Sequence, residues 1–95
     1  MVFEWDEEKD KNNQRKHGLA FKDAKYVFAD PFAICRDDYT KTEHRQQIMG
    51  HIGGTILVLV VYTMRDKQSE DVIRIISARK ATAAERRKYE TGKRF

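Results

Sequence analysis

Ninety-five residues with 40% hydrophobic, 11% aromatic and 36% charged side chains predict one small folded domain, residues 1–95, and exclude a disordered or multidomain chain. The net charge of +4 is unevenly placed: residues 1–64 hold nine Lys/Arg and ten Asp/Glu, whereas residues 65–95 hold ten and five. A basic final third is typical of a nucleic-acid footprint or of a solvated basic helix. The sequence has no long apolar stretch and no signal-peptide pattern, which predicts a cytoplasmic protein without a membrane partner. The single Cys35 excludes an internal disulfide, and its apolar surroundings predict a small core residue.

A polar helix is predicted after a short alternating strand at residues 2–5. Asp6 can cap the N-terminus of this helix, and Gly18 can end it just after His17. The helix has almost no apolar face, but at positions i, i+4 and i+7 it carries a polar stripe made of Lys9, Asn13 and Lys16. The stripe could line a cleft, or it could pin the helix to the rest of the fold.

A second helix is predicted over residues 21–28, because apolar residues recur there at helical spacing and Asp30-Pro31 follows. Strands are predicted at residues 32–36, 45–52, 55–64 and 72–77, with a hairpin turn at Gly53-Gly54 and polar loops at 37–42 and 65–71. A capping box from Thr82 to Glu85 opens the last helix. The predicted class is α+β: one antiparallel sheet of three to four strands plus the short N-terminal strand. Two N-terminal helices and one C-terminal helix pack on this sheet, and its other face is partly open.

Three arginines lie on or beside the last two predicted strands: Arg65, Arg74 and Arg79. A hairpin brings Arg65 near Arg74, whereas strict alternation puts Arg74 and Arg79 on opposite faces unless a bulge re-aims Arg79. An arginine in an apolar run is costly to bury without an anion, and guanidinium groups bind phosphates well. The alternative for Arg74 is a buried ion pair with the acidic first helix. If the two arginines do lie on opposite faces, we expect Arg74 to be the structural one.

Arg45 begins the polar face of the first hairpin strand, with Glu43 and His44 before it and His51 at the far end. A carboxylate, an imidazole and a guanidinium would suffice to cleave RNA without a metal. A base takes the 2′-hydroxyl proton, arginines stabilise the transition state, and an acid protonates the leaving oxygen. No spacing is typical of metal ligands, so no metal or other cofactor is expected. Tyr89 in the last helix could stack on a base, donate a proton or anchor that helix to the sheet.

Several motifs follow one another over nearly the whole chain: Phe3-Glu4-Trp5-Asp6, Lys16-His17-Gly18, Asp30-Pro31, Glu43-x-Arg45, Val60-Val61-Tyr62-Thr63, Ile73-Arg74-Ile75-Ile76-Ser77-Ala78-Arg79 and Glu85-Arg86. As an ordered set they resemble the BrnT family, the ribonuclease toxins that BrnA antitoxins accompany in bacterial type II toxin–antitoxin systems. The resemblance implies a RelE-like α+β fold and a metal-independent endoribonuclease that inhibits translation. It also implies a BrnA-like antitoxin that neutralises the toxin and brings operator DNA to the complex.

The resemblance also implies an active site that includes Arg45, Arg65, Arg74 and Arg79, with Glu43 and Tyr89 behind them. RNA is then the substrate. Two alternatives stay open on the sequence. One is a non-catalytic RNA- or protein-binding module on the same fold, and the other is an inactive scaffold that only binds an antitoxin.

Overall fold

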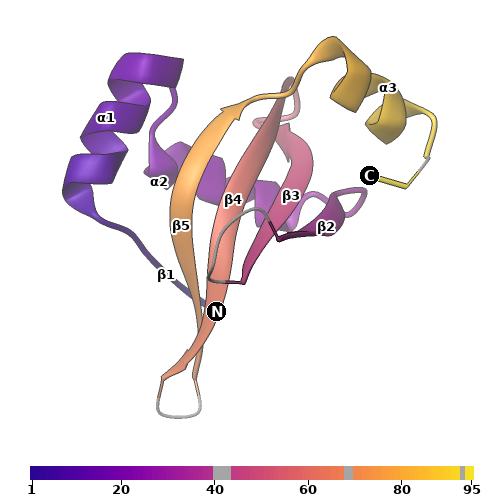
Figure 1. Ribbon diagram of the computed structural model, residues 1–95. Helices are drawn as coiled ribbons and strands as arrows, with labels where there is room; N and C mark the ends of the chain where they lie inside the picture. Colours follow the sequence, from indigo (N-terminus) through magenta and orange to yellow (C-terminus); the bar gives the residue numbers. More distant parts are fainter. Residues whose placement is uncertain (40–43, 68–69, 93) are drawn as a thin grey trace.

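The computed structural model describes residues 1–39, 44–67, 70–92 and 94–95, with backbone alone at 66–67. In chain order the elements are β1 (Val2–Glu4), α1 (Glu7–His17), α2 (Phe21–Ala24), the 3-10 helix η1 (Lys25–Ala29), β2 (Ile34–Asp38), β3 (Arg45–Ile52), β4 (Ile56–Lys67), β5 (Glu70–Lys80) and α3 (Ala83–Glu90). The described strands form one sheet in the order β1-β5-β4-β3-β2, with β4 and β5 as its long central hairpin (Figure 1). None of the described helices is long and apolar enough to cross a membrane.

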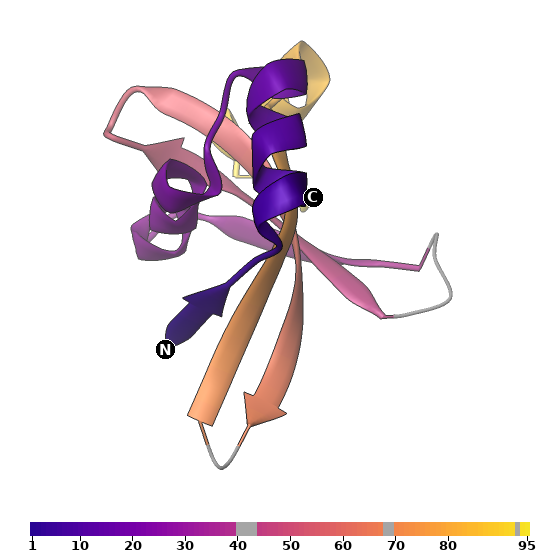
Figure 2. The same cartoon turned by 90° about the vertical axis from the view of Figure 1, so that its left-hand side faces the viewer.

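The α+β class is confirmed, but the sheet is mixed and has five described strands rather than being purely antiparallel. β1 runs parallel to β5, pairing Val2 with Val72 and Glu4 with Arg74. β1 runs in this direction because its end leads straight into α1, and α1 packs beside the second half of β5. Figure 2 shows α1 standing along this edge of the sheet.

Several predicted boundaries were wrong. β4 runs to Lys67 and β5 begins at Glu70, both within the stretch 65–71 that was predicted as a loop, so that Arg65 lies within β4; β5 then extends to Lys80. The second helix is α-helical only over α2 and then tightens into η1. Cys35 is exposed rather than part of the core, because β2 is the edge strand of the sheet.

The two faces of the sheet are covered differently. On one face, α2 and η1 bury the main core, which includes Phe21, Val60 and Ile75. On the opposite face, a smaller cluster of Met49, Leu57 and Leu59 lies under Tyr89 of α3. α3 covers only this end of the face (Figure 1). Polar side chains occupy much of the remainder.

A β-bulge sits in the middle of β5. Val61 pairs with Ser77, but the next residue of β4, Tyr62, pairs with Ile75, so Ile76 is an extra residue without a partner. The bulge shifts the alternation of β5 by one residue, and Ile75 and Ala78 therefore both face the main core.

Asn13 joins α1 to the edge of β5 beyond this bulge. Its side-chain amide donates to the carbonyl of Ala78 at 2.8 Å and its carbonyl accepts from the Ala78 N–H at 3.1 Å. The same amide donates to the carbonyl of Leu19 at 2.8 Å. Asn13 is buried, so these bonds replace the strand partner that β1 is too short to provide.

Asn13→Ala should therefore lower the free energy of unfolding by about 2–4 kcal/mol, because both polar groups of the Ala78 backbone lose their buried partner. Urea denaturation measures this. The control is Asn12→Ala, an exposed neighbour on the same helix, which should change stability by less than about 0.5 kcal/mol. Equal losses in the two variants would contradict the pinning role of Asn13.

Candidate functional site

Polar side chains gather on the face of the sheet opposite α2 and η1, away from the end that α3 covers; we call this the open face. The register places on it Arg36 of β2, Arg45 and Gln47 of β3, Thr63 and Arg65 of β4, and Arg74 and Ser77 of β5. Arg65 pairs with Val72, two residues before Arg74, so the two arginines are diagonal neighbours. Three of the predicted site residues thus come from three adjacent strands onto one face.

The bulge decides where Arg74 and Arg79 point. Arg74 pairs with Thr63 and Arg79 pairs with Leu59, and these two residues of β4 lie on the same face. The prediction from strict alternation, that the two arginines lie on opposite faces, was therefore wrong. Instead, a bulge at Ile76 turns Arg79 to the face of Arg74, which is the exception that the sequence left open.

Arg74 is held by a carboxylate from the neighbouring strand. Its guanidinium lies 2.9 Å from the Glu4 carboxylate, and both side chains are partly exposed. The partner belongs to β1, not to the acidic first helix considered from the sequence. Because the pair is partly exposed, a ligand anion can reach the guanidinium without a buried ion pair being broken.

Arg79 makes a tighter ion pair. Its guanidinium donates two hydrogen bonds to Glu85, at 2.8 and 2.9 Å, while Glu85 also accepts from the Thr82 N–H in the capping box of α3. The hydrogen bonds from Arg79 contribute most to lowering the pKa of Glu85 to about 2, and burial opposes them. Arg79 therefore joins the end of β5 to the start of α3.

Tyr89 belongs to a second polar network, with Asp30 and His51. Its hydroxyl donates to the Asp30 carboxylate at 2.6 Å, and His51 Nδ1 lies 3.1 Å from the same hydroxyl. Since the hydroxyl has one hydrogen, which it donates to Asp30, His51 must donate through Nδ1. The network needs Gly50, because a Cβ there would come within 3.0 Å of the Asp30 carboxylate.

Burial and the hydrogen bonds of this network shift the pKa values of Asp30 and Tyr89. Burial favours a higher pKa for the Asp30 carboxyl. Hydrogen bonds from Tyr89 and from the His51 and Phe32 amides nonetheless hold its pKa below the usual value. Burial and the bond to Asp30 raise the pKa of Tyr89 to about 12, which makes its hydroxyl a poor proton donor near neutral pH. The sequence pointed to Tyr89 and His51 but not to Asp30, whose only signal was a helix-ending Asp-Pro pair.

A cavity of about 300 Å³ opens where α1 meets the open face; we call it the basic hollow. It is lined by Lys9, Asn12, Asn13, Lys16, His17, Arg45, Ile76 and Ser77. Three of these side chains are cationic and none is a carboxylate, so the lining favours an anionic ligand. Both roles considered for the polar stripe are therefore present: Asn13 pins α1, while Lys9 and Lys16 line a cleft.

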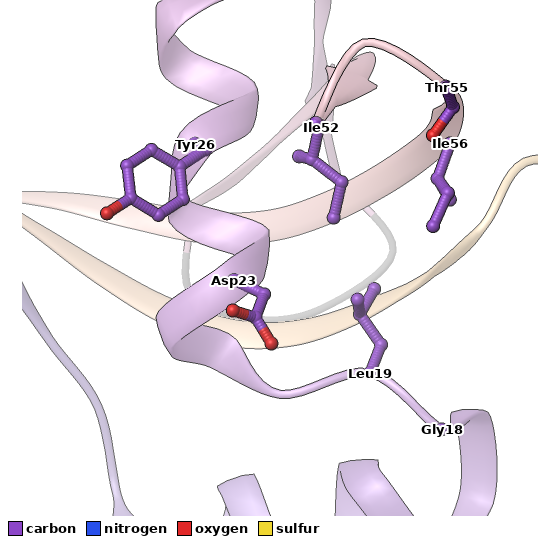
Figure 3. A pocket seen from close by; sticks show the side chains of 8 residues that line it. Gly18, Leu19, Asp23, Tyr26, Ile52, Thr55 and Ile56 are labelled. Atoms are coloured by element: carbon purple, nitrogen blue, oxygen red, sulfur yellow. The ribbon is translucent and has the colours of Figure 1, made fainter.

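Two other hollows lack this charge. One, of about 380 Å³, lies between Tyr26, Ile52 and Ile56, and Asp23 is its only charged side chain (Figure 3). The other, of about 490 Å³, is next to Asp30 and His51 and has no lysine or arginine in its lining. Neither suits a polyanion. Among the described residues, no three His, Cys, Asp or Glu side chains come together as metal ligands, and Glu43 lies outside the described residues.

Comparison with known proteins agrees with this picture. A family model described as the ribonuclease toxin BrnT of type II toxin–antitoxin systems matches residues 5–85. The 1.1 Å crystal structure of the Brucella abortus ribonuclease toxin BrnT is similar, with a TM-score of 0.60 and 28% identity, covering 86% of this chain and 99% of that chain. No curated protein matches. The fold and these matches define a ribonuclease toxin of a type II toxin–antitoxin system. Within that class, the chain belongs to the BrnT family.

The Arg79–Glu85 pair predicts a pH-dependent stability. The pKa of Glu85 falls from 4.5 to about 2 on folding, so the pair stabilises the fold above pH 4.5 and loses this effect as the pH falls towards 2. Allowing for solvent screening, Glu85→Gln should lower the unfolding free energy by about 1–2 kcal/mol at pH 7 and by much less near pH 2.5. Gln keeps the capping box, so urea denaturation at the two pH values isolates the ion pair. A difference that does not depend on pH would contradict this assignment.

Proposed function

We propose that this chain is a metal-independent endoribonuclease with a RelE-like fold, whose cleavage of RNA inhibits translation. A BrnA-like antitoxin neutralises it, and the operator DNA is bound only through that complex. The shared placement of Arg45, Arg65 and Arg74 on the open face is the observation that carries the proposal. Family membership supports the reaction class, and the basic hollow beside these arginines supports a polyanionic substrate.

The chemistry requires a proton acceptor, a proton donor and stabilisation of charge on phosphorus. The base removes the proton of the RNA 2′-hydroxyl, the 2′-oxygen attacks phosphorus, and the 5′-oxygen leaves with a proton from the acid. Guanidinium groups suit the middle step because they bind the equatorial oxygens in two places and stay charged at any working pH. We assign this step to Arg45, Arg65 and Arg74.

The other predicted site residues take supporting roles in this proposal. Arg79 is occupied by Glu85, and the Tyr89 hydroxyl is occupied by Asp30, so both position α3 beside the open face. Glu43 stays a candidate for proton transfer. His17 also lines the basic hollow.

The buried hydroxyl of Thr63 gives separate support. It lies on the open face opposite Arg74, and its oxygen has no hydrogen-bond partner among the described residues. An unsatisfied buried hydroxyl costs about 1–3 kcal/mol. A phosphate oxygen bound at Arg74 would satisfy it once the side chains that bury the hydroxyl move apart.

Cleavage of a labelled RNA by the purified protein tests the reaction. The wild type should cleave with the same rate in excess chelator, and Arg74→Ala should lower the rate about 100-fold or more at equal folded fraction. Glu4→Gln is the matched control, since it breaks the same ion pair but leaves the guanidinium in place. It should retain cleavage. Equal cleavage by both variants would make Arg74 structural, and no cleavage by the wild type would favour a non-catalytic binding module.

Expression in a bacterium tests the antitoxin. The chain alone should arrest growth, and co-expression of the adjacent antitoxin gene should restore it. Arg74→Ala should form the same complex without arresting growth, as judged by co-purification. A wild type that binds the neighbouring protein yet never slows growth would favour the inactive scaffold.

A further inference from the structure

Lys9 and Lys16 are two cations of α1 that line the basic hollow; the helix dipole favours Lys16, in the last turn, but not Lys9. Both are exposed, and neither ammonium group has an ion pair or hydrogen bond within the part of the chain that the structure describes. Lys9 lies in the first turn, where the positive end of the helix dipole disfavours a cation by about 0.3–1 kcal/mol. Arg74 and Arg79, by contrast, each have a carboxylate partner. Two uncompensated cations on one helix face favour an external anion.

The helix geometry also sets the size of that anion. Lys9 and Lys16 are seven residues apart, about two turns or 10 Å along the axis, and both line the basic hollow. Asn13 lies between them and is already used by the Ala78 backbone. Arg45 approaches from the sheet side. Cations spread over such a length suit a chain of phosphates better than one small ion.

The bulge completes the hollow from the sheet side. Ile76 and Ser77 line it, presenting an apolar side chain next to a hydroxyl donor. Ser77 comes three residues after Arg74 on the same open face, so the hollow adjoins the arginines assigned to the reaction. An apolar patch beside cations fits a nucleotide, whose sugar and base are less polar than its phosphate.

We propose that the basic hollow is a substrate-positioning subsite, in which Lys9 and Lys16 bind backbone phosphates of single-stranded RNA next to the phosphate that is cleaved. The inference rests on the proposed function and extends it to α1, which the basic final third of the sequence does not include. The two lysines are positioning residues, so they act on substrate binding rather than on the chemical step.

The test uses a fluorescent 2′-O-methyl oligoribonucleotide, which the reaction cannot cleave because its 2′-oxygen is blocked. Lys9→Gln/Lys16→Gln is compared with Lys11→Gln/Lys22→Gln, which removes two exposed lysines that do not line the hollow. Anisotropy titrations over a salt series should show an affinity about tenfold lower for the first variant. The slope of log affinity against log salt should fall by about 1.4, which corresponds to two phosphate contacts. The control should match the wild type. On cleavable RNA, the first variant should raise KM at an unchanged kcat.

Equal affinities and salt slopes in the two variants would overturn the subsite. The subsite would also be overturned if Lys9→Gln/Lys16→Gln lost affinity for the antitoxin alone, since the hollow would then bind an acidic protein segment. A wild type that binds the oligonucleotide through the two lysines but never cleaves RNA would support the subsite and refute the proposed function. Circular dichroism and thermal melting establish that both variants fold, as expected for exposed positions.

Discussion

The contact between Asn13 and Ala78 is the constraint on which the functional side of this molecule depends. β1 covers only the first part of β5, and a strand edge beyond it would leave buried backbone groups without partners. The Asn13 side chain satisfies both the N–H and the carbonyl of Ala78, and it fixes the height of α1 along the sheet. The basic hollow exists because α1 is held there.

The bulge at Ile76 has the complementary effect within the sheet. It lets Ile75 and Ala78 both enter the main core while Arg74 and Arg79 share the opposite face. Without the extra residue, one of the two arginines would point into the apolar core. The two arginines have different roles. Arg79 forms an ion pair that joins α3 to the sheet, whereas Arg74 has only a partly exposed ion pair with Glu4.

Much of this architecture could be predicted from sequence, because the signals are local. The left-handed Gly18 that ends α1, the Gly53-Gly54 turn and the capping box at Thr82 are as expected. The alternation of β3 correctly puts Arg45 and His51 on one face. Features that depend on tertiary contacts could not be predicted in this way. Neither the parallel pairing of β1 nor the edge position of Cys35 is encoded in a short window, because each depends on which strand lies next to it.

The candidate site divides in the same way. The sequence identified the arginines as candidate site residues. It allowed for a bulge in β5 but did not locate it. Asp30 was missed because its role depends on a residue 59 positions away, Tyr89. The lysines of α1 could be placed on one helix face, but their proximity to Arg45 follows only from the packing of α1 on β5.

The central claim is that RNA binds the open face beside α1. NMR titration of the isotope-labelled protein with a non-cleavable RNA tests it most directly, because amide shifts locate the ligand without relying on a variant. We predict that the largest shifts fall on Lys9, Lys16, Arg45 and the bulge at Ile76 and Ser77. Shifts confined to the opposite side, around Tyr26 and Ile56, would contradict the account.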